Sequence, residues 1–422
     1  MNLPLSLSVQ SLVAAMLAKP GNRSQFHLMI EVAMGKLEQA VASATDYLLL
    51  LDRSGSMGDI VGSATKLDVL KAACENVING LNPDDRVGIV SFDHAPHTVL
   101  GMTACNHAGK VNAVNAIYGL NLGGSTAFAP ALQEAFRTVG AESSRKRAIL
   151  FFTDGEDGGS DPRAVAKQIQ SAGISLYAGG LGVRNEGEKL LDELAGANFR
   201  SLTDAKDVTT FFAGAQAQAQ AAIVTNLQLR VTPVTFAVQT NFELVARQGK
   251  PNYVPSDPSK KTVLLGDMGE GDLYQAYLGL QVALPEDIKS GRRAFGKIEI
   301  VGDVVSQGIK AGVLGSTPIA VMFSDQPVAT VNQAVKDMIN TAATAREMFK
   351  FSQTGDASHV ANARKTAAFS NDAVAKALQA QLAEIESKVA SDPNAAQKQA
   401  RRATKGFSAE DAAAALKNLG RS

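Results

Sequence analysis

Five consecutive apolar residues, Tyr47-Leu48-Leu49-Leu50-Leu51, run directly into Asp52 and constrain the fold more than any other part of the sequence. A strand or helix with one solvated face would carry polar residues at regular intervals, and this run has none. Both of its faces must therefore be buried, as in the central strand of a parallel sheet that helices cover on both sides. The run predicts an α/β domain.

Strand-like and helix-like segments continue to alternate from residue 46 to residue 222. We expect further strands at 86–92, 148–152, 174–178 and 199–202, and helices at 66–81, 129–139, 162–172, 186–194 and 208–222. Regular alternation of this kind is typical of a doubly wound α/β domain of the Rossmann-like type, here spanning residues 41–223.

The segments on either side of this block have the two-residue period of half-buried strands. Apolar residues alternate from Phe26 to Val32 before the block and from Ala276 to Leu284 after it. Prolines punctuate the later strands, which suits a β-sandwich better than further α/β units. We therefore expect residues 1–40 and 224–327 to build one β-sandwich, into which the α/β domain is inserted.

The last part of the chain, residues 328–422, is predicted to be helical. Apolar residues recur at helical spacing over 331–342 and 374–389. These stripes indicate an antiparallel helical hairpin that packs on itself or on the sandwich; the alternative is an intermolecular coiled coil, through which the chain would oligomerise. The basic residues at the end of this region predict a solvated helix face rather than an anion-binding patch, and they are Lys398, Arg401, Arg402 and Lys405.

Charge and hydropathy narrow the classes of partner. Lys+Arg and Asp+Glu both number 41, so no excess charge points to nucleic acid, and no nucleic-acid partner is expected. No apolar stretch reaches the length of a membrane span, and the first residues lack the pattern of a signal peptide. With only Cys74 and Cys105, the chain has no disulfide framework. These features predict a soluble, cytoplasmic protein.

Oxygen-bearing side chains stand at the ends of two predicted strands and before one predicted helix. The first strand ends at Asp52, and Ser54 and Ser56 follow in a turn around a glycine; Thr126 follows paired glycines ahead of a helix; Asp154 follows the strand 148–152. Loops at the carboxyl ends of strands form the ligand crevice of a doubly wound sheet, so these residues are expected at one edge. The candidate metal ligands are Asp52, Ser54, Ser56, Thr126 and Asp154.

The chemistry of this set favours a hard divalent cation. Hydroxyl and carboxylate oxygens without His or Cys are typical ligands of Mg²⁺ or Mn²⁺, with Ca²⁺ as a further candidate. Only two of the candidate ligands are carboxylates, so the cation would keep enough positive character to attract an external anion.

The motif DxSxS at 52–56, the downstream Thr126 and the triplet Thr153-Asp154-Gly155 resemble the metal-ion-dependent adhesion site of the von Willebrand factor A family. The resemblance covers about residues 44–222. It implies that Ser54, Ser56 and Thr126 hold the metal directly or through water, while Asp52 and Asp154 hold its coordinated waters or exchange with them. A Glu or Asp of a protein partner would fill the remaining position. The flanking strands and C-terminal helices resemble bacterial cytoplasmic A-domain proteins.

The resemblance implies a non-catalytic, metal-dependent protein-binding module, a scaffold in an intracellular bacterial complex. An adaptor or chaperone for an AAA+ ATPase is a second interpretation. A metal-dependent hydrolase is a third, disfavoured because no general base is evident beside the carboxylates. We expect the loops 57–65, 93–107, 155–161 and 183–187 to surround the crevice and select the partner.

Two other clusters in the sequence are weaker candidates for metal binding. Residues 93–107 hold an aspartate, three histidines and a cysteine, but their spacing fits no closed zinc pattern. Glu156 and Asp157 follow the predicted ligand Asp154 and would be available to a second cation; a solvated loop is the simpler interpretation.

Overall fold

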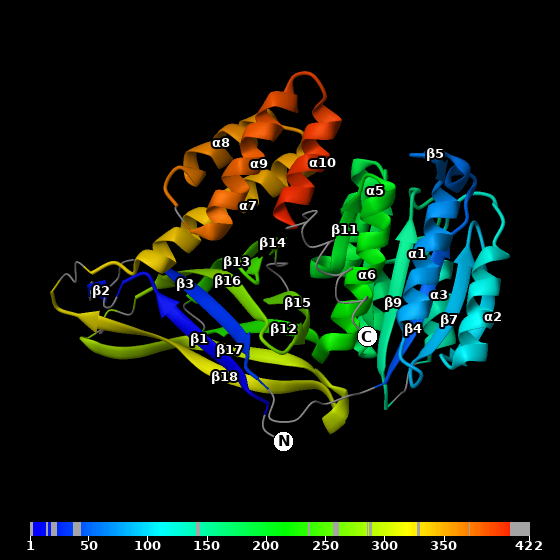
Figure 1. Cartoon of the computed structure of the whole chain (residues 1–422). Coiled ribbons are helices and arrows are strands. Elements are labelled where there is room, and N and C mark those ends of the chain that lie inside the picture. The colour runs from blue at the N-terminus through cyan, green and yellow to red at the C-terminus, as the bar shows by residue number, and fades with distance from the viewer. Residues whose placement is uncertain are drawn as a thin grey trace.

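The computed structural model describes residues 3–13, 16–17, 23–36, 44–140, 144–234, 237–255, 261–284, 286, 289–326, 330–370 and 372–405. Figure 1 shows an α/β domain beside a layered β structure, with a group of helices lying over the β layers. The expected domain limits at residues 40 and 327, and residues 406–422 of the expected helical region, lie outside the described part of the chain.

The α/β domain is built on a sheet whose strands follow the order β11-β10-β9-β4-β7-β8. Its strands are β4 (Thr45–Asp52), β7 (Arg86–Phe92), β8 (Pro96–Ala104), β9 (Lys146–Thr153), β10 (Ser175–Leu181) and β11 (Phe199–Leu202). All neighbouring pairs are parallel except β7 and β8. The apolar run forms β4 in the middle of this sheet, and every residue of β4 is buried.

Helices cover both faces of this sheet, as the continuous apolar run requires. They are α1 (Lys66–Gly80), α2 (His107–Tyr118), α3 (Phe128–Val139), α4 (Arg163–Ser171), α5 (Asn185–Ala195) and α6 (Ala205–Ala221). Leu49 and Leu51 of β4 share a core with α1, α2 and α6, whereas Leu48 and Leu50 share a second core with α3, α4 and α5. The doubly wound fold expected from the sequence is confirmed.

Short elements connect the first strand to the first helix. They are the 3-10 helix η1 (Gly55–Gly58) and the hairpin strands β5 (Ile60–Val61) and β6 (Ala64–Thr65). A second 3-10 helix, η2 (Gly196–Asn198), precedes β11. Short hydrogen-bonded elements therefore occupy most of the connection between β4 and α1.

The expectation that residues 93–107 form a loop is wrong over most of that range, because Pro96–Ala104 is the edge strand β8. All residues of β8 are exposed or only partly buried, so its sequence lacks the apolar alternation of a strand with one covered face. The register against β7 also shifts twice, next to Ile89, which breaks the two-residue period. A solvated, bulged edge strand leaves a weak sequence signal.

Two sheets pack face to face in the β part of the molecule. One has the order β1-β3-β16-β13-β14 and the other β15-β12-β17-β18-β2. The strands are β1 (Leu5–Ser11), β2 (Met16–Leu17), β3 (Arg23–Met34), β12 (Ala222–Pro233), β13 (Ala237–Arg247), β14 (Lys250–Pro255), β15 (Thr262–Gly269), β16 (Leu273–Ala283), β17 (Gly291–Val304) and β18 (Ile309–Ser324), with the 3-10 helix η3 (Val305–Gln307) before β18.

Strand pairing joins the two ends of the α/β insertion. In the antiparallel ladder between β3 and β16, Phe26 lies opposite Leu280 and Val32 opposite Tyr274. Both sheets contribute to one hydrophobic core, for example Ile30 from the first and Ile300 from the second. The predicted sandwich, made of strands before and after the α/β domain, is confirmed.

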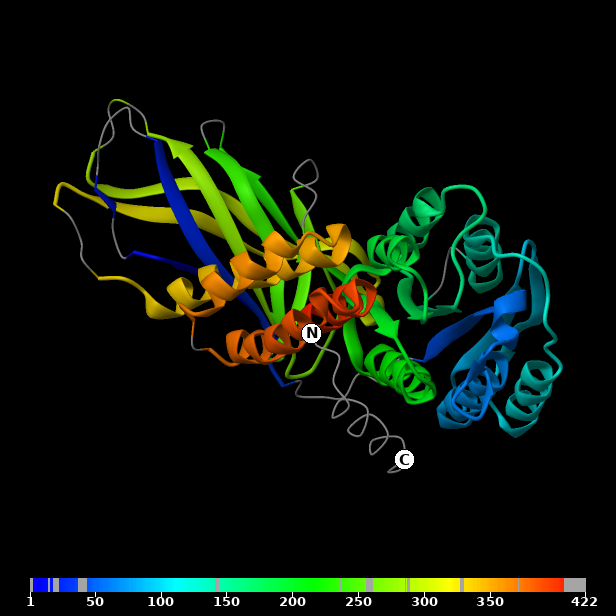
Figure 2. The same ribbon diagram turned by 90° about the horizontal axis from the view of Figure 1, so that it is seen from above.

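The C-terminal helices α7 (Gln333–Thr354), α8 (Ala357–Ala367), α9 (Ala373–Val389) and α10 (Pro393–Thr404) lie across the sandwich, as Figure 2 shows from above. Phe351 of α7 and Leu378 of α9 share a core with Tyr253 of β14. From Val335 onward the first apolar stripe packs on the sandwich, and the second stripe is buried among the helices from Val374 to Ile385, whereas Val331 is exposed. Burial within the chain agrees with the hairpin interpretation and leaves these buried side chains unavailable for a coiled coil. No helix among the described residues combines the length and the hydropathy needed to cross a membrane.

The expectation of a solvated basic face at the end of α10 is wrong for two of its residues. Arg401 and Lys405 are buried. They form ion pairs with Glu188 and Asp192 of α5, so α10 is held against the α/β domain, beside α5 in Figure 1. Sequence patterns assign charged side chains to the surface, because burial of a charge depends on a partner that lies far away in the sequence.

Candidate metal centre

The carboxyl edge of the α/β sheet gathers the predicted ligands from three loops. Asp52 is the last residue of β4, Ser54 directly precedes η1, and Ser56 lies within η1. Asp154 follows the end of β9, and Thr126 stands two residues before α3. This edge is the upper end of the α/β domain in Figure 1, where β5 is labelled.

Three of the predicted ligands contact one another through their oxygens. Ser54 Oγ lies 3.2 Å from Ser56 Oγ, and Ser56 Oγ donates a 2.8 Å hydrogen bond to Asp154 Oδ1. Ser54 and Asp154 are buried, whereas Ser56 is exposed. The oxygens therefore form a row that opens to solvent at Ser56.

Asp52 lies beneath this row and is fully buried. Its carboxylate accepts a hydrogen bond from the backbone N–H of Ser54 at 2.7 Å and another from Thr153 Oγ1 at 2.5 Å. Burial raises the pKa of Asp52 to about 6, although these hydrogen bonds act in the opposite direction. Burial thus destabilises the negatively charged form of Asp52, and a cation bound nearby would stabilise it.

Backbone hydrogen bonds join the loop of Thr126 to the loop of the two serines. Gly55 N donates to Gly124 O at 2.9 Å, and Gly123 N donates to Arg53 O at 2.6 Å. Thr126 itself lies beside Gly155: a methyl group added to Gly155 would stand 2.8 Å from Thr126 Oγ1. The segments that carry the five predicted ligands are therefore hydrogen-bonded to, or packed against, one another.

Lys66, the first residue of α1, joins this cluster, although it is not among the ligands predicted from the sequence. Its Nζ lies 2.6 Å from Asp154 Oδ2 and 3.3 Å from Asp59 Oδ2. Burial disfavours the charged ammonium, but the hydrogen bonds and charges of Asp154 and Asp59 together outweigh it and raise the pKa of Lys66. Nothing in the local sequence marks a lysine at the start of a helix as part of a site, because only the fold brings it to Asp154.

Arg53 and Asp93 form a second ion pair at this edge, with Arg53 Nη2 at 2.7 Å from Asp93 Oδ2. Burial acts to raise the pKa of the Asp93 carboxyl. Hydrogen bonds from the backbone N–H groups of Ala95 and Gly124, together with the charge of Arg53, act in the opposite direction, and the pKa of Asp93 is lowered. Its carboxylate is therefore occupied within the protein. Across the described residues, no three His, Cys, Asp or Glu side chains come together as a metal cluster.

The two carboxylates that follow Asp154 have structural contacts. Asp157 Oδ1 accepts hydrogen bonds from the backbone N–H of Phe128 at 2.9 Å and of Gly159 at 3.1 Å, so it caps the start of α3. Glu156 is partly exposed and lies 3.7 Å from Arg184. These contacts agree with the solvated-loop interpretation of this segment, in which Asp157 also fixes the loop to α3.

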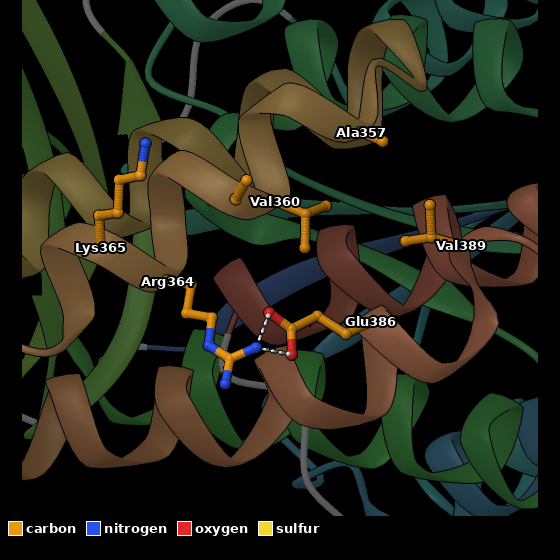
Figure 3. Close-up of a pocket in the computed structure, with 7 residues that line it drawn as sticks. Ala357, Val360, Arg364, Lys365, Glu386 and Val389 are labelled. Carbon is orange, nitrogen blue, oxygen red and sulfur yellow. Dashed lines mark hydrogen bonds and ion pairs between the residues drawn. The ribbon is translucent and has the colours of Figure 1, made fainter.

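An open groove of about 520 Å³ lies between α8 and α9 on the helical region (Figure 3). Its walls are mainly apolar, and Arg364 and Glu386 form a 3.2 Å ion pair across it. With one carboxylate, already paired, among its lining residues, the groove lacks the oxygen donors that a hard cation needs. The sheet edge is the better candidate.

The side-chain oxygens at the sheet edge are suitable ligands for a hard divalent cation. Two serine hydroxyls and one carboxylate oxygen lie in a continuous row, and a second carboxylate lies buried beneath them with a raised pKa. Oxygen-only sets of this kind match the preferences of Mg²⁺ and Mn²⁺.

A sequence profile described as the von Willebrand factor type A domain matches residues 47–156, which include most of β4, all of β7 and β9, and all five predicted ligands. The chain contains a von Willebrand factor type A domain. A search of curated protein sequences finds no match to the chain.

Two solved structures are similar to this chain over nearly its full length. A von Willebrand factor type A protein from Catenulispora acidiphila has a TM-score of 0.67 and 16% identity, covering 96% of this chain and 97% of that one. The ArnB paralog VWA2 from Sulfolobus acidocaldarius has a TM-score of 0.64 and 14% identity, covering 96% and 99%. At such low identity the likeness concerns the fold: an A domain combined with strand-rich sheets and C-terminal helices.

Proposed function

We propose that this protein is a metal-dependent protein-binding module, in which a divalent cation at the carboxyl edge of the A domain recruits a carboxylate of a protein partner. A domains in general mediate protein–protein interaction. The observation that carries the proposal is the row of oxygens formed by Ser54, Ser56 and Asp154, with Thr126 in the adjoining loop. We assign the cation to these residues and Asp52, and favour Mg²⁺ or Mn²⁺.

The residues of the chain would supply binding and orientation, and the cation would supply charge. Neutral hydroxyls from Ser54, Ser56 and Thr126 leave most of the cation's charge uncompensated. Ser56 lies at the solvent side of the row, so a partner carboxylate can approach there. The surrounding loops would then determine which partner is accepted, because one charged contact cannot specify a protein.

The proposal predicts that partner binding requires both the cation and Thr126. Partners would be captured in Mg²⁺ and identified, and their affinity measured in Mg²⁺ and in EDTA for the wild type and Thr126→Ala. We expect high affinity only for the wild type in Mg²⁺, because the other three conditions lack the cation or one of its ligands. Agreement of all four affinities within about threefold, or roughly 0.65 kcal/mol, would place the partner site elsewhere.

Gly155→Ala should weaken Mn²⁺ binding by about tenfold, or about 1.4 kcal/mol, through displacement of a ligand loop. The added methyl group would stand 2.8 Å from Thr126 Oγ1, closer than side chains approach one another, so Thr126 or its loop must shift. Gly214→Ala is the matched control, since a methyl group there meets no atom within 4 Å. Calorimetric titration with Mn²⁺ measures both variants; equal affinities in the two would contradict the assignment of Thr126.

A further inference from the structure

Lys66 places a positive charge directly beside the proposed cation site. Its Nζ contacts Asp154 Oδ2 at 2.6 Å, while Asp154 Oδ1 accepts the hydrogen bond from Ser56 Oγ. The carboxylate of Asp154 is fully buried and the side chain of Lys66 is 17% exposed. Water screens such a pair poorly, so the ammonium acts strongly on any other charge at this edge.

The local structure holds Lys66 in this position. It is the first residue of α1, and Thr65 caps the helix through a capping box with Asp68. The backbone N–H of Lys66 also donates to Asp59 O at 2.9 Å. The side chain therefore starts from a fixed backbone and reaches Asp154 from the rim of the site.

The charges of Lys66 and of the neighbouring carboxylates determine the net charge of the site once a cation is bound. Asp52 and Asp154 carry two negative charges, which a divalent cation alone would neutralise. With Lys66 present, the buried charges of the loaded site sum to one positive charge, which a single partner carboxylate neutralises. Asp59 also lies 3.3 Å from Lys66 Nζ, but its side chain is 68% exposed, so water screens its charge. Arg53 and Asp93 pair with each other and leave this balance unchanged.

We propose that Lys66 weakens binding of the cation to this site and strengthens binding of the partner carboxylate that follows. The inference rests on the proposed function, because it takes the cation site as given. Repulsion between the ammonium and the cation lowers cation affinity. The same ammonium attracts the incoming carboxylate, so the site discriminates in favour of anionic groups more strongly than the cation would alone.

Lys66→Met tests this through two affinities that should move in opposite directions. Calorimetric titration of the full chain with Mn²⁺ should show binding about tenfold tighter than in the wild type, equivalent to about 1.4 kcal/mol. The Mn²⁺-loaded variant should bind an acetylated Gly-Glu-Gly peptide at least about threefold more weakly, followed by water-proton relaxation. The Gly-Gln-Gly peptide is the uncharged control.

Two further variants make the result specific. Lys66→Gln should reproduce both shifts and keeps the assay informative if the methionine variant folds poorly. Lys71→Met removes a charge from the same helix, where the ammonium contacts Tyr118 O and not the site, and should leave both affinities within about twofold of the wild type.

Each alternative gives a different pattern. If Lys66 served only to hold Asp154 in place, its removal would weaken Mn²⁺ binding, and that result would overturn the inference. Unchanged affinities in Lys66→Met and Lys66→Gln, with Mn²⁺ binding still lost in Asp52→Ala, would also overturn it and leave the proposed function intact. A wild type that does not bind Mn²⁺ would overturn both.

Discussion

Arg401→Ala should lower the free energy of unfolding by about 3–5 kcal/mol, because it leaves a buried carboxylate without its partner. The guanidinium of Arg401 and the carboxylate of Glu188 pair with neither side chain exposed to solvent. Arg401 Nη2 also donates to Ser352 O at 2.7 Å, and Ser201 Oγ donates to Glu188 Oε1 at 2.5 Å. One arginine thus connects α10, α7 and the A domain.

Urea denaturation followed by circular dichroism measures this loss. Arg364→Ala is the control, since its pair with Glu386 lies in the same helical region but the arginine is 75% exposed; the expected change is below about 1 kcal/mol. The double variant Glu188→Gln with Arg401→Met should recover part of the stability, because it removes both buried charges together. Equal losses in Arg401→Ala and Arg364→Ala would mean that α10 is not held to the A domain by this pair.

Asp52→Asn should abolish Mn²⁺ binding and, in EDTA, make the protein more stable than the wild type by as much as about 3 kcal/mol. Asparagine keeps the size of the side chain: its Oδ1 can accept from Ser54 N, and its Nδ2 can donate to Thr153 Oγ1, which then acts as the acceptor. It removes a charge whose burial raises the pKa of Asp52 to about 6. Calorimetry with Mn²⁺ and urea denaturation in EDTA measure the two effects.

The same raised pKa predicts how the stability of the metal-free protein depends on pH. The folded state holds the proton of Asp52 more tightly than the unfolded state, whose ordinary value is 3.8. This group therefore contributes stability at low pH that is lost as the pH rises from about 4 through about 6. Asp52→Asn should lack this component, so its advantage over the wild type should be larger at about pH 7 than at about pH 4.5. An equal difference at both values would contradict the raised pKa.

The features that the sequence predicts well are those with a strong local signal. The apolar run before Asp52 has both faces buried, and alternate residues of β4 pack into cores on opposite sides of the sheet. The alternation from Phe26 to Val32 marks a strand. A similar alternation after the A domain indicates that strands on both sides of this domain share one sandwich, and β3 pairs with β16. The serines, the threonine and the aspartates stand out because they end strands or precede a helix.

The features that the sequence did not predict depend on partners distant along the chain. Lys66 reaches Asp154 across 88 positions, and Arg401 reaches Glu188 across 213. A charged residue on a helix carries no local sign of such a partner, so its expected place is the solvent. Strand β8 was missed for another reason: it is a bulged edge strand whose side chains are at most partly buried, and it lacks a clear period.

We expect a divalent cation to be held by Asp52, Ser54, Ser56, Thr126 and Asp154. Crystals of the full chain grown with Mn²⁺ would reveal its position. Anomalous diffraction from manganese locates the ion without assumptions about its ligands. We expect a peak about 2.1 Å from the hydroxyl oxygens of Ser54 and Ser56, and its absence in crystals of Asp52→Asn. A peak elsewhere on the chain with none at this edge, or an undiminished peak in Asp52→Asn, would contradict the assignment.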